Sequence, residues 1–87
     1  MPVRYKYLIT KRAKQDLESL APNVRERIKT KLLFFIMSED PLYFAERLKD
    51  RKDGDYRFRV GVYRIVFTKE ADILYILRVQ HRRDVYR

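Results

Sequence analysis

Arginine side chains recur at alternate positions in one segment of the chain, and this spacing points to a site for an anion. Arg57 and Arg59 lie in a stretch with the two-residue period of a β-strand. If Gly61–Val62 forms the turn of a hairpin, Arg59 lies directly opposite Arg64 on the next strand. Like charges that face each other destabilise a sheet, so three arginines on one face need an explanation. A phosphate group provides one, because guanidinium groups bind phosphate through two parallel hydrogen bonds.

The charge of the whole chain supports a polyanionic partner. Among 87 residues there are 21 lysines and arginines against 12 aspartates and glutamates, which gives a formal net charge of +9. Such an excess favours nucleic acid, whereas the ion-pair networks of a thermostable surface need nearly balanced signs. The alternative for the three arginines is a solvated sheet face that Asp53 or Asp55 partly neutralises.

The last ten residues, 78–87, form a second basic segment. They carry four arginines, one histidine and one tyrosine against a single aspartate. Histidine side chains titrate near neutral pH, so His81 is a candidate general acid or base. Tyr86 is a candidate for stacking on a base or orienting a nucleophile. The alternatives are a hydrogen-bonded surface histidine and a generic electrostatic patch.

Composition argues against metal and membrane chemistry. The chain has no cysteine and a single histidine, which excludes disulfides, thiolate metal sites and zinc sites built from histidine pairs. We therefore expect no metal and no cofactor. The longest apolar run, Leu32–Met37, has six residues, far short of the roughly 20 that span a bilayer. No signal peptide is recognisable, so a cytoplasmic protein without a membrane segment is expected.

The elements that must position the basic residues follow from hydrophobic periodicity. Strands are expected at 3–9, 56–60, 62–67 and 73–79, helices at 11–20 and 24–37, and one helical turn within 42–48. The near-continuous apolar run of the last strand predicts a central place in the sheet. The expected fold is a single α+β domain covering residues 1–87 in the order βααβββ. Its helical hairpin packs on a small, mostly antiparallel sheet.

Two segments resemble the RelE/ParE superfamily of toxins: Tyr56–Phe67 (YRFRVGVYRIVF) and Ile76–Tyr86 (ILRVQHRRDVY). The hallmark of that superfamily is a hairpin of the form YR-(L/F)-R-x-G-x-YR-(I/V) that leads to a final V-x-HRR-(D/E)-VY. Arg47–Lys49 also stands where members carry a (K/R)L(K/R) segment. The similarity covers nearly the whole chain, and the tail with its terminal tyrosine indicates the ribonuclease branch.

The resemblance implies a toxin of a type II toxin–antitoxin system that enters the ribosomal A site. It would be an mRNA interferase, an endoribonuclease that inhibits translation by cutting mRNA without a metal ion, through attack of the RNA 2′-hydroxyl. By position, Arg64 would stabilise the transition state and Arg82 or Arg83 would be the tail arginine. Tyr86 would be the tail tyrosine, and His81 matches a histidine that only some members carry. The residues expected to bind RNA are Arg47, Lys49, Arg57, Arg59 and Arg78.

The second predicted helix is apolar nearly all round, because Leu33, Phe34 and Met37 lie off its core stripe. These residues pack against the first helix and the segment near Leu42 and Phe44, or they form a groove for a partner; both can hold. The resemblance implies a small acidic antitoxin, RelB-like, that wraps the toxin with amphipathic helices, in a heterotetramer or similar complex.

Two other functions compete with the ribonuclease. A ParE-type toxin would share the fold but inhibit DNA gyrase and cleave nothing. A non-catalytic basic module would bind ribosomal RNA. A small acidic reading frame beside the gene would separate a toxin from a housekeeping module.

Overall fold

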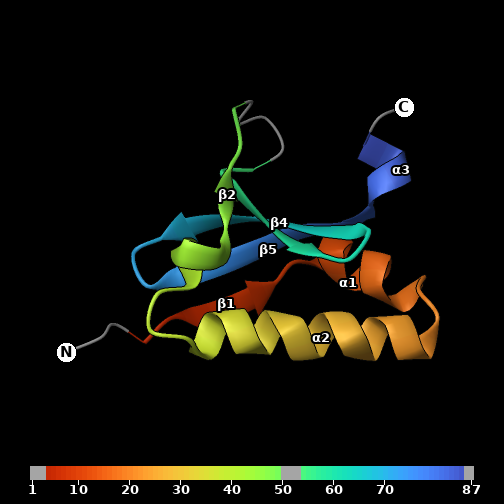
Figure 1. The fold of residues 1–87 in the computed structure, drawn as a ribbon, viewed down its shortest axis with the longest axis horizontal. Helices are drawn as coiled ribbons and strands as arrows, with labels where there is room; N and C mark the ends of the chain where they lie inside the picture. The colour runs from red at the N-terminus through yellow and green to blue at the C-terminus, as the bar shows by residue number, and fades with distance from the viewer. Residues whose placement is uncertain (1–3, 50–53, 86–87) are drawn as a thin grey trace.

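The structure, a computed structural model, describes residues 4–49 and 54–85. In chain order its elements are β1 (Lys6–Ile9), α1 (Lys11–Glu18), α2 (Pro22–Met37), the 3₁₀ helix η1 (Pro41–Phe44), β2 (Glu46–Arg47), β3 (Tyr56–Val60), β4 (Tyr63–Glu70), β5 (Ile73–His81) and α3 (Arg82–Val85) (Figure 1). In the part of the chain that is described, no helix is long and apolar enough to cross a membrane.

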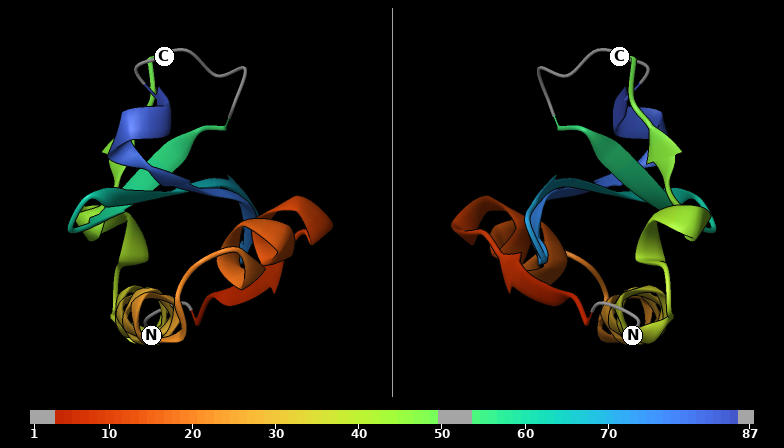
Figure 2. Two further views of the ribbon diagram at one scale, coloured as in Figure 1. Left: turned by 90° about the vertical axis from the view of Figure 1, so that its right-hand side faces the viewer. Right: turned by 90° about the vertical axis from the view of Figure 1, so that its left-hand side faces the viewer.

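The five strands form one mixed sheet in the order β1-β5-β4-β3-β2. β1 runs parallel to β5, and the other neighbours are antiparallel. The views in Figure 2 show α2 on one side of this sheet and α3 on the other. The α+β class, the mostly antiparallel sheet and the interior place of β5 confirm the prediction from sequence.

One strand was not predicted. Residues 42–48 were expected to form a helical turn, but the turn is the 3₁₀ helix η1, which ends at Phe44. Ala45 then has extended backbone angles (φ −96°, ψ 152°), and Glu46–Arg47 pairs with β3 as the edge strand β2. The pairing places the charged side chains of β2 beside those of β3.

Local signals in the sequence explain where the helices begin. Thr10 caps α1, because its hydroxyl accepts a hydrogen bond from the backbone N–H of Ala13 at 3.3 Å. The same hydroxyl lies 2.8 Å from the carbonyl oxygen of Ile76 and donates to it, which ties the start of α1 to β5. α2 begins at Pro22 rather than residue 24, because proline is well suited to the first position of a helix.

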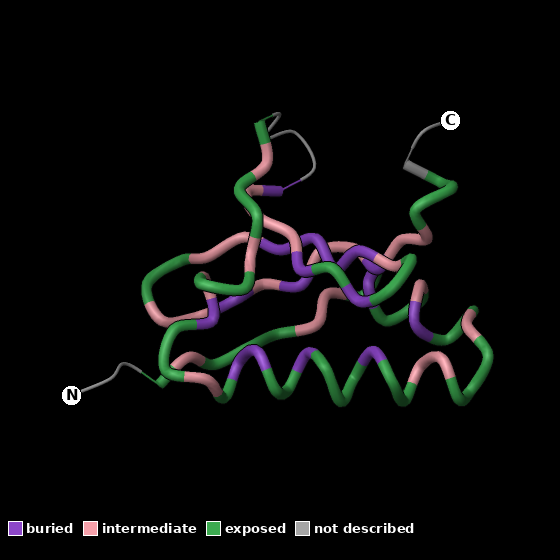
Figure 3. Tube along the Cα trace, viewed as in Figure 1, coloured by how far each residue is buried: buried purple, intermediate pink, exposed green. Residues whose placement is uncertain are grey.

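The core lies between α2 and the sheet, where Figure 3 shows the buried segments facing each other. Aromatic rings connect the two layers. Phe35 of α2 stacks on Phe58 of β3 with ring centroids 4.7 Å apart, and Phe58 stacks on Phe67 of β4 at 4.4 Å. The buried aliphatic residues of α2 are Ile28, Leu32 and Ile36.

The core fixes which side chains remain on the other side of the sheet. Successive residues of a strand point to opposite faces. Phe58 and Ile65 are fully buried in the core, so Arg57, Arg59 and Arg64 belong to the opposite surface. We call this surface of the sheet, which carries those three residues, the arginine face.

Candidate nucleic-acid interface

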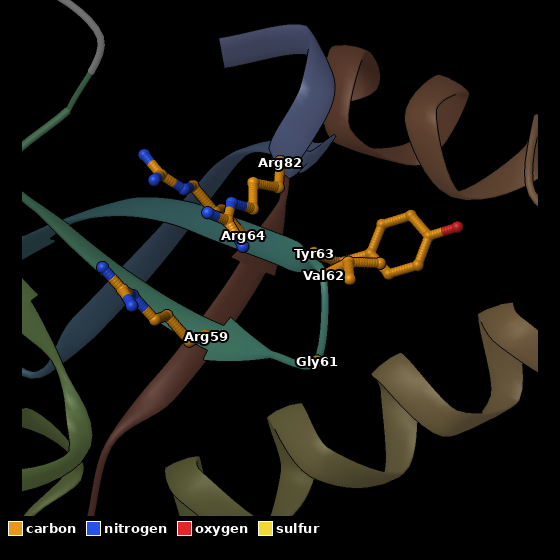
Figure 4. A pocket seen from close by; sticks show the side chains of 6 residues that line it. All are labelled: Arg59, Gly61, Val62, Tyr63, Arg64 and Arg82. Atoms are coloured by element: carbon orange, nitrogen blue, oxygen red, sulfur yellow. The ribbon is translucent and has the colours of Figure 1, made fainter. Parts of the chain in front are cut away.

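Three arginines from three different elements line one cavity on the arginine face. The cavity has a volume of about 210 Å³ and is lined by Arg59, Gly61, Val62, Tyr63, Arg64 and Arg82. Figure 4 shows the side chains of Arg59, Arg64 and Arg82 on one side of the hairpin, whereas the ring of Tyr63 points away from them. A hollow with several guanidinium groups fits an oxyanion such as phosphate.

The hairpin between β3 and β4 brings two of these arginines together. Its turn is Gly61–Val62, and the φ of +60° at the glycine fits the first central position of a type II′ turn. Arg59 therefore lies directly opposite Arg64, with Arg57 on the same face of β3. This register is the one predicted from the sequence.

The third arginine comes from the first position of α3. The backbone N–H of Arg82 donates to the carbonyl oxygen of Val62 over an N–O distance of 2.6 Å, which ties the start of α3 to the hairpin turn. Arg83, the next residue, is exposed, and its backbone N–H donates a hydrogen bond to Nδ1 of His81. Of the two arginines that the sequence left as alternatives, Arg82 lines the cavity.

Arg64 and Arg59 differ in how far they are exposed to solvent. Arg64 is buried, with 9% of its surface exposed, on a strand between β3 and β5. The side chain of Arg59 is 57% exposed. Fewer side-chain conformations are open to a buried residue, so Arg64 is the more rigid donor of the pair.

A carboxylate from β2 joins the arginine cluster. Glu46 lies opposite Arg57 in the pairing of β2 with β3. Its Oε2 accepts a hydrogen bond from Nη2 of Arg57 at 2.7 Å, and its Oε1 lies 3.0 Å from Nε of Arg59. The hydrogen bond from Arg57 is the main cause that holds the pKa of Glu46 below its ordinary value. Burial opposes this effect, and the positive charges of Arg57, Arg59 and Arg64 add to the lowering of the pKa. Glu46 is therefore ionised at neutral pH.

The two aspartates expected near the arginines are Asp53 and Asp55. Asp55, one of the two aspartates expected to neutralise the arginines, instead accepts a hydrogen bond from the hydroxyl of Thr68. The other, Asp53, lies outside the described residues. Within residues 4–49 and 54–85, histidine and acidic side chains form no group of three that could hold a metal ion.

By alternation along β5, His81 lies on the side of the sheet that faces α2, opposite to the side of Arg59 and Arg64. It is two residues beyond the buried Val79 and pairs across the sheet with Tyr63, whose ring it meets edge-on at 5.2 Å. Its Nδ1 accepts the backbone N–H of Arg83 at 2.9 Å. The neutral ring therefore carries its proton on Nε2. The structure does not bring His81 together with Arg59 and Arg64.

The comparison with known proteins agrees with this architecture. Residues 7–86 match the family described as ParE toxin of type II toxin–antitoxin systems. The chain belongs to the RelE/ParE toxin family. It is 32% identical over 89 residues to Toxin RelG of Mycobacterium tuberculosis, a match that covers 100% of this chain and 99% of the relative.

Solved structures of RelE-type complexes share the fold. The toxin–antitoxin complex RelBE2 of M. tuberculosis gives a TM-score of 0.71 at 27% identity, covering 92% of this chain and 100% of the other. The RelB–RelE complex of Methanococcus jannaschii gives a TM-score of 0.71 at 28% identity, with coverage of 91% and 94%. This RelE/ParE chain is therefore similar in fold to toxins crystallised with their antitoxins.

The remaining residues expected to bind RNA are dispersed in this RelE/ParE domain. Arg47 and Lys49 are exposed on and just after β2. Arg78 is engaged with α1, because its Nε lies 2.8 Å from a carboxylate oxygen of Asp16. The same carboxylate accepts the backbone N–H of Val79, so Asp16 closes the edge of β5 beyond its pairing with β1. The predicted catalytic tyrosine, residue 86, lies outside the described residues.

Sequence reasoning missed two polar residues of the arginine face. Glu46 contacts two of the arginines, but its strand is only two residues long and left no periodic signal. Gln80 pairs with Arg64 across β4 and β5 and so belongs to the same face. Alternation from the buried Val79 would have identified Gln80 once the last strand was known to continue past it.

The family's expected antitoxin-binding residues form an exposed apolar surface at the end of α2. Phe34 and Met37 are 58% and 83% exposed, and Leu33 is exposed as well. Phe34 also packs on Phe44 of η1, with ring centroids 5.7 Å apart. Tyr43, 80% exposed, continues the surface along η1. Phe34 therefore packs on η1, as one of the two sequence interpretations holds, and the groove for a partner stays a prediction.

Proposed function

We propose that this toxin is a ribosome-dependent endoribonuclease that cuts mRNA in the A site and thereby inhibits translation. One observation carries the proposal: Arg59, Arg64 and Arg82 converge on a single cavity from β3, β4 and α3. Opposed arginines destabilise an isolated sheet, and an RNA phosphate removes that repulsion.

The arginines supply charge to the reaction. When the 2′-hydroxyl attacks the adjacent phosphorus, negative charge develops on the phosphorane oxygens, and the products are a cyclic phosphate and a 5′-hydroxyl. Guanidinium groups at fixed positions stabilise that charge without a metal ion. Arg64 is the best placed for this task because it is buried, whereas Arg57 and Arg59 bind the RNA backbone.

Proton transfer needs a different group, because arginine is a poor base with a pKa above about 12. His81 lies on the opposite side of the sheet from Arg64. In this proposal the proton passes to a lysine or to a group of the ribosome, and Tyr86 orients the nucleophile. Reliance on the ribosome also predicts weak activity on free RNA.

A small acidic, RelB-like antitoxin is the proposed partner. It would cover Leu33, Phe34 and Met37, together with Tyr43, in a heterotetramer or similar complex. The similar solved structures are RelB–RelE antitoxin–toxin complexes, and an acidic partner complements a toxin of net charge +9. Since translating ribosomes are the proposed target, the toxin acts in the cytoplasm.

The second candidate is inhibition of DNA gyrase, favoured by the match to the ParE description. Toeprinting of a translating message in a purified translation system separates the two functions. The ribonuclease gives new primer-extension stops at the A-site codon, also after a chelator has removed trace transition metals, and leaves gyrase supercoiling unchanged. Inhibited supercoiling with an intact message would establish the second candidate.

A further inference from the structure

Glu46 binds Arg57 and Arg59, the two arginines that the proposed function uses to bind the RNA backbone. Its two carboxylate oxygens bind Nη2 of Arg57 at 2.7 Å and Nε of Arg59 at 3.0 Å. Carboxylates and phosphates use the same guanidinium donors with similar geometry. In the free protein, therefore, an anion of the chain itself already sits on part of the arginine face.

We propose that Glu46 is an internal ligand of the arginine face, which holds Arg57 and Arg59 in the free toxin and is displaced when an RNA phosphate binds. The inference rests on the proposed function, since it takes RNA as the ligand of this face. It assigns Glu46 a regulatory role, separate from the RNA-binding and catalytic roles proposed for the arginines.

Because of its position, Glu46 can leave the two arginines at a small cost in free energy. β2 is a two-residue strand at the edge of the sheet, and the Glu46 side chain is 47% exposed. A carboxylate that leaves such a place returns to water, so no charge becomes stranded in the core. Exposed ion pairs are weak, whereas an RNA strand gains from counterion release at each phosphate that it neutralises.

The surroundings of Arg57 also favour replacement of Glu46 by an RNA phosphate. Its side chain is only 18% exposed, and its Nε is buried without a hydrogen-bond partner among the described residues. Each carboxylate oxygen of Glu46 already serves one arginine. A buried donor left unsatisfied is unfavourable, so a ligand with further acceptor oxygens has an advantage over Glu46.

The internal ligand also keeps the site assembled. Arg57 and Arg59 project from the same face of one strand, and Arg64 lies opposite Arg59. Without a counter-charge these side chains repel each other. Glu46 holds Arg57 and Arg59 in place. It therefore also competes with every incoming anion for these two side chains. Weak polyanions are therefore excluded more than a correctly presented RNA strand.

The test compares Glu46→Gln with Glu70→Gln. Both variants remove one negative charge, but Glu70 is exposed at the far end of β4. The probe is a fluorescein-labelled single-stranded RNA with 2′-O-methyl groups, which block cleavage. Glu46→Gln should bind it about 3- to 30-fold more tightly than wild type, as expected for the loss of two competing exposed ion pairs. Glu70→Gln should change Kd by less than about twofold, as a generic surface charge does.

A mutant cycle locates the effect. In a protein that carries Arg57→Ala and Arg59→Ala, Glu46→Gln should no longer tighten binding, because the contested donors are gone. Equal Kd values for the Glu46 and Glu70 variants would overturn the inference, as would failure of both to bind RNA. So would a lower saturated cleavage rate for Glu46→Gln without tighter binding, which would make Glu46 a proton-transfer group. The proposed function fails separately, if wild-type toxin leaves mRNA on ribosomes uncut.

Discussion

Arg59 and Arg64 are identical in chemistry and lie opposite each other, yet their surroundings give them different tasks. Arg59 is mostly exposed, and its Nε is shared with Glu46. Arg64 is buried on an interior strand. A donor that is held in place before the reaction loses little entropy when charge develops. We therefore expect Arg64 to contribute more to the rate and Arg59 more to the affinity for RNA.

Replacing Arg64 with alanine tests this division. Single-turnover cleavage on ribosomes should fall by about 100- to 1,000-fold, the usual effect of removing one fixed donor to a developing charge. The Kd for ribosomes should change little, since Arg59 and Arg82 remain. Arg59→Ala should show the reverse pattern, and Arg12→Ala, at a side chain 64% exposed on α1, serves as the control.

Arg64 is buried, so its loss also disturbs the sheet. Arg64→Lys keeps the charge and most of the stem but not the two parallel donors, and it should remain slow. Urea unfolding of both variants shows whether the fold is intact. Wild-type cleavage by Arg64→Ala at saturating ribosomes, with only Kd raised, would contradict the assignment and direct attention to Arg82.

The position of His81 predicts that this side chain is not the main proton-transfer group. General acids and bases typically contribute at least about 100-fold to a rate. Because His81 lies on the side of the sheet that faces α2, away from Arg64, His81→Gln should reduce the rate of single-turnover cleavage by less than about 100-fold. The glutamine carbonyl still offers an acceptor for the backbone N–H that Nδ1 accepts now. A loss of about 100-fold or more would instead support the proton-transfer role expected from the sequence.

Among the elements, β5 shows how far sequence reasoning reached. Its apolar run predicted an interior strand, and the Gly61–Val62 turn predicted the register of β3 on β4; both are confirmed. The side of the sheet on which His81 lies was not predictable. Val66 of β4 pairs with Arg78, but the next residue, Phe67, pairs with Ile76, so β5 has one extra residue at this point. That irregularity reverses the alternation along the rest of β5, and no residue type marks it.

β2 was missed for a different physical reason. Glu46–Arg47 is too short for a periodic pattern, and it is a strand only because β3 pairs with it. Such a contact depends on two segments separated in the chain, whereas propensity acts locally. Glu46 was therefore absent from the predicted site, although Arg57 and Arg59 were present.

Gly54, two residues before β3, has a backbone conformation and surroundings that favour glycine. Its φ is +152°, and a Cβ there would lie 2.6 Å from Cγ1 of Val66 and 3.3 Å from the carbonyl oxygen of Phe67. Gly54→Ala should lower the free energy of unfolding by about 2–4 kcal/mol, through backbone strain and a clash with a buried side chain.

Gly61→Ala is the matched comparison. Its φ is also positive, at +60°, but the Cβ would meet the flexible end of Arg27, 2.9 Å away. The expected loss is about 1–2 kcal/mol, from the left-handed backbone alone. Urea denaturation measures both variants. Equal losses would mean that the contact of Gly54 with Val66 relaxes without cost.

The molecule as a whole presents two surfaces of different character. The arginine face lies on the side of the sheet away from α2, whereas the apolar surface of Phe34, Met37 and Tyr43 lies on α2 and η1. A partner on α2 and η1 therefore leaves the chemistry of the arginines unaltered. If the proposed antitoxin binds there, we expect it to inhibit the toxin by its bulk, or by a further segment that reaches the arginine face.

Met37→Glu should consequently separate antitoxin binding from cleavage. Met37 is 83% exposed, so the substitution removes little packing, but it places a charge in the proposed apolar contact with an acidic partner. The Kd for the cognate antitoxin should rise by about tenfold or more, as for a central interface residue. Cleavage on ribosomes should stay at the wild-type rate.

Asn23→Glu is the control, because it adds the same charge at the other, exposed end of α2. It should leave both the Kd for the antitoxin and the cleavage rate unchanged. Calorimetric titration with the antitoxin gives the Kd, and toeprinting gives the rate. If Met37→Glu binds the antitoxin as tightly as Asn23→Glu does, the antitoxin does not use the end of α2.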